Sequence, residues 1–140
     1  IYPNNDPGNK TIIDKLKKLS KNKAKFIFIK SMRFEYFLTL LKNSDFIIGN
    51  SSTGIREAPF YGIPTIDLGE RQKFRGNSIS IKNFAFDEKK ILDYISKLNK
   101  NFKSSKYYGT GNSLSKISKI VNKPIFWKTK IQKHFVIDRS

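Results

Sequence analysis

Short apolar runs alternate with segments of helical periodicity along this chain, and this alternation limits the fold more than any other feature. Strand-like runs lie at residues 26–29, 45–48 and 64–68, with a weaker one at 78–81. Helical spacing occurs over 12–19, 34–41, 55–61, 87–98 and 114–121, and a further helix is expected over 127–135. The strand–helix–strand order predicts an α/β domain with a parallel sheet, because parallel strands need a crossover between them.

One run and one helix stand out in this pattern. The run 26–29 is continuously apolar, as in a strand that is buried on both faces of a sheet. The helix over 87–98 begins at a good N-cap residue, Asp87. Its predicted inward-facing residues are Ile91, Leu92, Ile95 and Leu98.

Length and composition limit the class of protein. The 140 residues suffice for one domain with a core. No apolar run approaches the roughly 20 residues that span a bilayer. Cysteine is absent, which excludes disulfides and thiolate metal sites and agrees with a cytoplasmic location. The first residues, Ile1-Tyr2, have the character of the end of a strand, so we expect the chain to be a piece of a longer protein.

The net charge of +17 admits two interpretations. Nucleic-acid-binding proteins carry a basic surface, so a nucleic-acid module is one alternative. Lysine, isoleucine, asparagine and phenylalanine are all abundant, however, as AT-rich codons produce, and the lysines are spread from Lys10 to Lys133. We therefore expect no nucleic-acid partner and keep a weaker inference, that the basic background favours an anionic ligand.

Ligands of parallel α/β sheets bind beyond the carboxyl ends of the strands, so the loops there form the candidate site. The second strand-like run is followed by Gly49 and Gly54, with Ser51, Ser52 and Thr53 between them. Unpaired N–H groups at the start of the next helix would suit a phosphate. The alternative is that these hydroxyl residues are ordinary helix caps. The residues alone leave both readings open.

Charged and polar residues near this turn also have two interpretations each. Glu57, on the same short helix, either interacts with the helix dipole or accepts hydrogen bonds from ribose hydroxyls. Arg71 and Arg75 follow the next strand, where an arginine either contacts a phosphate or is solvated. Asn4 and Asp6 lie in a proline-containing turn, and they either reach a ligand or only shape the turn.

Groups that could carry out a reaction are not apparent in the sequence. The single histidine, His134, lies near the C-terminus without an assignable carboxylate or serine partner. No pair of acids is arranged for proton transfer, and no metal-ligand spacing occurs. We therefore expect no catalytic residue, no metal and no cofactor in this chain, which has the character of half a binding site.

Three segments carry a resemblance to a known family. The longest, GNSSTGIREAPFYGIPTIDLGERQKFRGN, contains the pattern G-N-S-S-x-G-I/V-x-E, then a strand, then G-x-R-Q-x-x-R. The others are YPNNDPGN, similar to P-N-x-D-x-G-S with Asn9 in place of serine, and SSKYYGTGNSLSKI, similar to S-x-x-Y-G-x-G-N. With these motifs the chain resembles, nearly from end to end, the carboxyl-terminal domain of the hydrolysing UDP-N-acetylglucosamine 2-epimerases.

The resemblance implies a two-domain fold of the glycosyltransferase-B type. Residues 1–123 would form its Rossmann-like, UDP-binding domain without the first strand or strands, and the helical tail 124–140 would pack on a missing amino-terminal domain. Ser51 and Ser52 would hold the diphosphate, backed by Gly54, and Glu57 would hold the ribose. Contacts to UDP are also implied for Asn4, Arg71 and the loop at Met32, which would pass along the uracil.

The family reaction eliminates UDP to give a glycal-type intermediate, and the addition of water then releases N-acetylmannosamine for sialic or nonulosonic acid synthesis. The proton-transferring acids lie in the amino-terminal domain, so this chain alone is expected to be inactive. Its expected partners are a UDP-sugar and that domain, with a homodimer left open. The alternatives are a 2-epimerase of a UDP-diacetamido-trideoxyhexose and a glycosyltransferase of the same fold type. A non-hydrolysing epimerase fits less well, because its usual turn is S-G-G.

Overall fold

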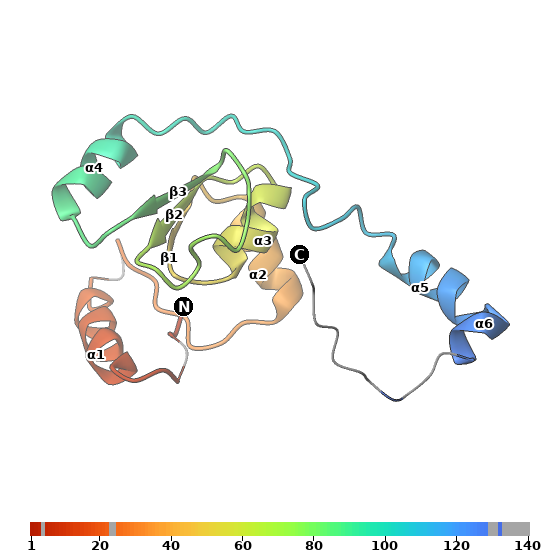
Figure 1. Ribbon diagram of the computed structural model, residues 1–140. Coiled ribbons are helices and arrows are strands. Elements are labelled where there is room, and N and C mark those ends of the chain that lie inside the picture. The colour runs from red at the N-terminus through yellow and green to blue at the C-terminus, as the bar shows by residue number, and fades with distance from the viewer. Residues whose placement is uncertain (4, 23–24, 129–131, 133–140) are drawn as a thin grey trace.

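The computed structural model describes residues 1–3, 5–22, 25–128 and 132. Its strands are β1 (Ile47–Gly49), β2 (Thr65–Leu68) and β3 (Ile81–Phe84) (Figure 1). Its helices are α1 (Asn9–Leu19), α2 (Phe34–Lys42), α3 (Thr53–Phe60), α4 (Glu88–Ser96), α5 (Ser113–Val121) and α6 (Pro124–Trp127).

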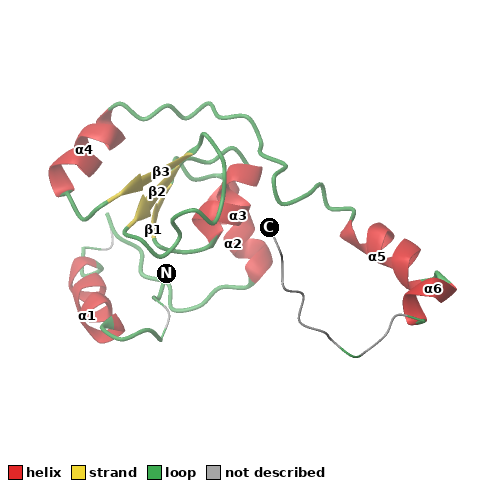
Figure 2. Ribbon diagram, in the orientation of Figure 1, coloured by secondary structure: helices red, strands yellow, loops and turns green. Residues whose placement is uncertain are grey.

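The three strands form one parallel sheet in the order β1-β2-β3. α3 connects β1 to β2 and packs against both strands, and α2 lies beside α3 (Figure 2). The central strand β2 is buried over its first three residues, as expected for a strand that is covered on both faces. This arrangement confirms the predicted α/β domain with a Rossmann-like parallel sheet.

The core is small and lies between α3 and the sheet. Ile66 on β2 is fully buried, and Ile55 and Ala58 on α3 are buried with it. Leu41 at the end of α2 completes this apolar cluster. The positions of α2 and α3 are therefore fixed by the burial of one apolar face from each helix.

The predicted strand at 26–29 is wrong for the described structure. This segment is extended but forms no part of the sheet, and Ile27 is 83% exposed. Among the described residues, the Tyr2 N–H donates to the Ile29 carbonyl at 3.1 Å, and the Phe26 N–H donates to the Asn22 carbonyl at 3.0 Å. An apolar run becomes a buried strand only when a neighbouring strand pairs with it, and the described chain supplies none here.

The weak strand expected at 78–81 is displaced, because β3 begins only at Ile81. Residues 78–80 instead form a turn, in which the Ile81 N–H donates to the Ser78 carbonyl at 3.1 Å. The Ser78 and Ser80 hydroxyls are 2.9 Å apart, and Ser80 is fully buried. Serine hydroxyls that bond locally favour a turn over a strand.

The last predicted helix also differs from the one observed. α6 ends at Trp127, where the prediction begins, and Pro124 occupies its first turn, a position where proline is well tolerated. The other residues of the 127–135 prediction lie mostly outside the described residues, as do His134 and Asn4. α5 and α6 extend away from the sheet (Figure 1). In the described part of the chain, no helix has both the length and the apolar character needed to cross a membrane.

α4 confirms the predicted N-cap and corrects one inward residue. The Asp87 carboxylate accepts a hydrogen bond from the Lys90 backbone N–H at 3.1 Å. Leu92, expected to face inward, is 57% exposed. Tyr94 instead packs on Phe84 of β3, with ring centroids 5.2 Å apart. The predicted amphipathic helix is therefore present, but Tyr94 lies on the face of α4 that meets the sheet, and Leu92 does not.

The Asp87 cap generates a pH-dependent prediction. The Lys90 backbone N–H, and then the Lys90 ammonium, lower the pKa of Asp87 below its ordinary value. A lowered folded-state pKa means that the cap stabilises the protein above the unfolded-state pKa and loses this effect as the pH falls through the folded-state pKa. We expect Asp87→Ala to lower the unfolding temperature at about pH 7, and we expect this effect to shrink as the pH falls through the lowered folded-state pKa of Asp87.

Thermal unfolding followed by circular dichroism measures this effect. Asp87→Asn is the matched control, because its amide oxygen keeps the cap acceptor without the titratable charge. A difference between the wild type and Asp87→Ala that stayed constant across the acid range would contradict the assignment.

Candidate functional site

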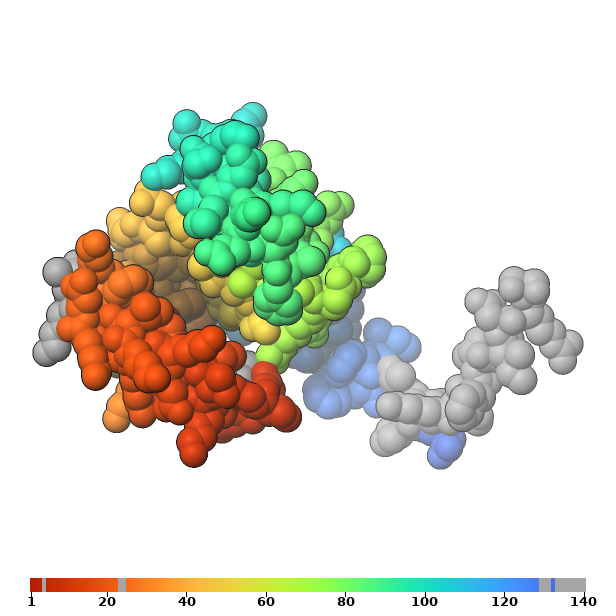
Figure 3. All heavy atoms as spheres, turned by 90° about the vertical axis from the view of Figure 1, so that its left-hand side faces the viewer, coloured from red at the N-terminus to blue at the C-terminus, as the bar shows by residue number. Residues whose placement is uncertain are grey.

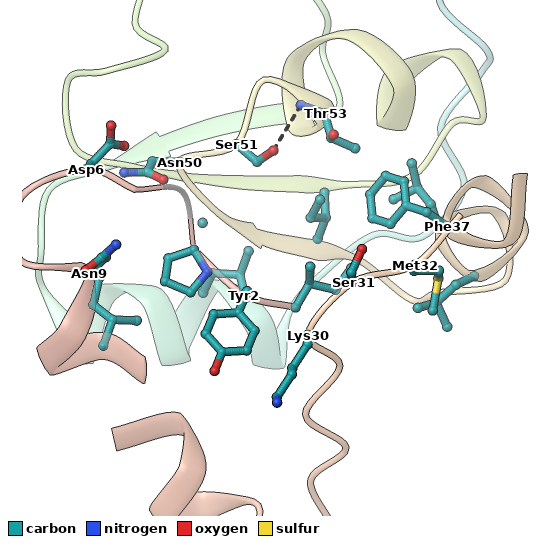
Figure 4. Close-up of a pocket in the computed structure, with 18 of the residues that line it drawn as sticks. Tyr2, Asp6, Asn9, Lys30, Ser31, Met32, Phe37, Asn50, Ser51 and Thr53 are labelled. Carbon is teal, nitrogen blue, oxygen red and sulfur yellow. Dashed lines mark hydrogen bonds between the residues drawn. The ribbon is translucent and has the colours of Figure 1, made fainter. Parts of the chain in front are cut away.

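A cavity of about 780 Å³ lies along β1 and beyond its carboxyl end, between that strand, the N-terminal segment and α2. Figure 3 shows the surface hollowed between α1 and the part of the chain that carries α2 and β1. Apolar side chains of α2 and β1 form the deep wall, among them Leu40, Leu41 and Ile48. Polar side chains lie at the carboxyl end, among them Asp6, Asn50, Ser51 and Thr53 (Figure 4). Arg71 also lines the cavity.

The turn before α3 contains both bonded and free N–H groups. The Ser51 hydroxyl accepts a hydrogen bond from the Thr53 N–H at 3.3 Å. The N-cap residue of α3 is Ser52, whose side chain makes no capping hydrogen bond. The N–H groups of Gly54 and Ile55 donate to the carbonyls of Ser51 and Ser52. Within the described part of the chain, the N–H groups of Ser51 and Ser52 themselves have no acceptor. Both readings of the turn, cap and anion site, are thus compatible with its geometry.

Gly54 is explained by packing rather than by access to the cavity. A Cβ atom at this position would lie 2.6 Å from the Cγ2 atom of Thr65. The Thr65 hydroxyl also donates to the Gly54 carbonyl at 2.6 Å, in a buried position. Neither Gly54 nor Ser52 is among the residues that line the cavity. A glycine here lets the first turn of α3 approach β2 closely.

Arg71 is held at the rim of the cavity by an ion pair. Its Nη1 atom lies 2.5 Å from the Asp6 carboxylate, 65 residues earlier in the chain. The pair joins the N-terminal loop to the loop that follows β2, and both residues line the cavity. An arginine has five N–H donors, so a contact through Nη1 leaves others for a ligand.

Gln72 is a residue of the site that sequence reasoning missed. It is buried, with only 4% of its surface exposed, and its Nε2 atom donates to the Asn50 carbonyl at 3.0 Å. Arg75 donates to the Gln72 Oε1 atom at 3.4 Å, and the Tyr108 hydroxyl donates to the Arg75 carbonyl. Arg75 is therefore engaged within the protein. The only signal for Gln72 in the sequence is its place in the G-x-R-Q-x-x-R pattern, which does not indicate its role.

The structure separates Glu57 from the other predicted site residues. Glu57 lines a second cavity of about 470 Å³, together with Arg56 and Tyr108. The Arg56 guanidinium lies over the Tyr108 ring, 5.8 Å from its centroid. Phe34, the first residue of α2, lines both cavities and thus stands between them.

The remaining predicted positions can now be placed. Met32 lines the first cavity, near Ser31 and Phe37 (Figure 4). Asn4 lies outside the described residues, so the structure does not place it. Across the residues that the structure describes, no three acidic or histidine side chains gather as a metal site would require. The cavity thus offers anion-binding groups at one end and an apolar wall along β1.

A family model described as UDP-N-acetylglucosamine 2-epimerase matches residues 1–122. The chain belongs to the UDP-N-acetylglucosamine 2-epimerase family. Membership in this family confirms the resemblance drawn from the three motifs. It also identifies the sheet as the Rossmann-like part of an epimerase domain.

Curated relatives of this epimerase-family chain come from several bacteria. It is 43% identical over 141 residues to "UDP-N-acetylglucosamine 2-epimerase" of Neisseria meningitidis serogroup B. The aligned region covers 97% of this chain and 37% of that protein. It is 31% identical over 115 residues to "UDP-N,N'-diacetylbacillosamine 2-epimerase (hydrolyzing)" of Legionella pneumophila, covering 81% of this chain and 30% of that protein. The chain therefore spans well under half the length of these relatives.

A third relative is "Polysialic acid biosynthesis protein P7" of Escherichia coli. The identity is 36% over 92 residues, covering 66% of this chain and 23% of that protein. The matched part is again a minority of the relative's length.

The close approach of Gly54 to Thr65 generates a prediction about stability. Gly54→Ala should destabilise the protein by about 1–3 kcal/mol, because the added methyl group overlaps a buried side chain. Thr65→Ser removes the Cγ2 atom but keeps the hydroxyl that donates to Gly54. We expect Gly54→Ala to cost much less in the Thr65→Ser background.

Chemical denaturation of the four proteins in this cycle measures the effect. An equal cost of Gly54→Ala in both backgrounds would show that packing against Thr65 is not the reason for the glycine.

Proposed function

We propose that this chain is the nucleotide-binding part of a hydrolysing UDP-N-acetylglucosamine 2-epimerase that acts in sialic or nonulosonic acid synthesis. The observation that carries the proposal is the exposed turn at Ser51 and Ser52, whose N–H groups have no acceptor among the described residues. Ser51 and Arg71 line the same cavity at the end of a parallel sheet. Helix starts with free N–H groups bind phosphates, and arginine adds charge-assisted bonds to phosphate oxygens. Family membership supplies the substrate class.

In the proposed reaction, the proton on C2 of the sugar is removed and the bond from C1 to the UDP oxygen breaks. UDP leaves with the electron pair, and a C1–C2 double bond forms. Water then adds its oxygen to C1, and a proton returns to C2 from the opposite face, which gives N-acetylmannosamine. The residues of this chain hold the leaving UDP. The groups that move the protons belong to the amino-terminal part of the longer protein.

Each predicted residue except Gly54 has a part in the proposed binding mode. Ser51 and Ser52 donate to the diphosphate through their N–H groups and hydroxyls, and Arg71 contacts UDP from the facing loop. The loop at Met32 runs along the uracil. Glu57 accepts hydrogen bonds from the ribose, which therefore lies on the side of Phe34 that faces the second cavity. Asn4 is proposed as a further contact to UDP.

The C-terminal tail is proposed to pack on the amino-terminal domain. Phe126 and Trp127 of α6 are 42% and 73% exposed. Leu114, Ile117 and Ile120 on α5 are exposed as well, so the two helices together carry an uncovered apolar surface. A surface of this kind on a domain that is a minority of its relatives' length supports contact with the rest of the protein.

A second candidate is a 2-epimerase for a UDP-diacetamido-trideoxyhexose, which the similarity to the Legionella protein favours. The two candidates share every step above and differ in the sugar. Product analysis by the full-length protein decides between them: release of N-acetylmannosamine from UDP-N-acetylglucosamine supports the first. A preference for the diacetamido sugar supports the second.

Calorimetry on the full-length protein tests the proposed UDP site. Arg71→Ala should weaken UDP binding by about tenfold to a hundredfold, as expected for the loss of a charged hydrogen bond. Glu57→Ala should weaken binding of UDP and of uridine, because the ribose is common to both. Lys97→Ala is the control, because Lys97 pairs with Asp93 on the surface at α4.

Two outcomes would overturn the proposal. One is UDP affinity that Arg71→Ala and Glu57→Ala leave unchanged. The other is salt-sensitive DNA binding by a protein that has no UDP affinity, which would support a nucleic-acid module instead.

A further inference from the structure

Gln72 is unusual among its neighbours because it is a polar side chain buried within an exposed turn. Arg71 and Lys73 on either side are exposed, whereas 4% of Gln72 is accessible. A buried amide is retained only where its polar atoms find partners. Its two ends are both used, since Nε2 donates to the Asn50 carbonyl at 3.0 Å and Oε1 accepts from Arg75 at 3.4 Å.

Several contacts hold the turn that carries Gln72 against the rest of the protein. A Cβ atom at Gly76 would lie 2.4 Å from the Ile55 Cγ2 atom, so this end of the turn packs tightly against α3. The Tyr108 hydroxyl donates to the Arg75 carbonyl, and the Asn83 amide donates to the Gly69 carbonyl at 2.7 Å. These contacts hold the turn in place, so the position from which Gln72 donates to Asn50 is fixed.

The bond to Asn50 has a direct consequence for Ser51. The Asn50 carbonyl and the Ser51 N–H belong to the same planar peptide unit, and in a trans peptide they point in opposite directions. The described chain contains no cis peptide bond. A donor that holds the carbonyl towards the protein interior thus turns the Ser51 N–H the other way. Accepting this hydrogen bond also polarises the peptide and strengthens its N–H as a donor.

We propose that Gln72 is a positioning residue that aims the Ser51 N–H at the diphosphate of the bound nucleotide. This inference rests on the proposed function, since it requires the anion to lie at the Ser51 turn. Gln72 does not line the cavity and acts through Asn50. The hydrogen bond thereby links Gln72 to Asn50, although the two residues lie 22 positions apart in the chain.

The test uses the full-length protein and two probes, UDP and uridine. Gln72→Glu has nearly the same shape, but an ionised carboxylate cannot donate to the Asn50 carbonyl. We expect it to weaken UDP binding by about tenfold or more, because it repels the carbonyl that it should hold. Uridine binding should stay unchanged, since uridine has no phosphate. A purely structural role would lower both affinities together.

Ser80→Ala is the control, because Ser80 is also a buried polar residue but lies just before β3 and bonds to Ser78 rather than to Asn50. If Gln72→Glu weakens UDP and uridine binding equally, or weakens neither, the inference is wrong. A wild-type protein that binds no UDP would instead overturn the proposed function itself.

A second measurement needs no variant and applies if Gln72→Glu fails to fold. In the amide spectrum of the wild-type protein, the Ser51 proton should shift downfield when UDP is added and should not shift with uridine. A Ser51 amide that does not respond to UDP, in a protein that binds UDP, would overturn the inference.

Discussion

The contact between Gly54 and Thr65 fixes the geometry on which the candidate site depends. No side chain fits between them, and the Thr65 hydroxyl closes the contact with a buried hydrogen bond of 2.6 Å to the Gly54 carbonyl. The start of α3 is thereby pressed onto the central strand of the sheet. Because β1 leads directly into this helix, the turn at Ser51 must lie at the carboxyl edge of the sheet, where parallel α/β domains bind their ligands.

Long-range polar contacts then assemble the rim of the cavity around this turn. Arg71 reaches Asp6 on the N-terminal loop, and Gln72 reaches Asn50 on the turn itself. The two contacts differ in kind. The ion pair is more than two fifths exposed on both sides, so solvent screens it and it contributes little to stability. The amide contact is part-buried, and its donor Gln72 is only 4% exposed, so solvent screens it less and it is the contact that sets the backbone direction.

The sequence predicted what depends on local periodicity and capping, and less of what depends on tertiary partners. α4 and its cap at Asp87 follow from nearby residues alone, and both are observed. The run 26–29 is just as apolar as a strand, but hydrophobicity measures what a segment could bury and does not supply a neighbour to pair with. Gln72 is a polar residue that folding buries, and its neighbours along the chain give no indication of this burial.

On the proposed function, the placement of donors around the leaving group affects the rate as well as the affinity. As the bond from the sugar to UDP breaks, negative charge grows on the diphosphate. N–H groups that are already aimed at this position interact more strongly with the transition state than with the bound substrate. A peptide held by Gln72 would have little reorganisation left to undergo at that moment. The part of the protein that holds UDP would then share in the chemistry, even if the groups that move protons belong to another part.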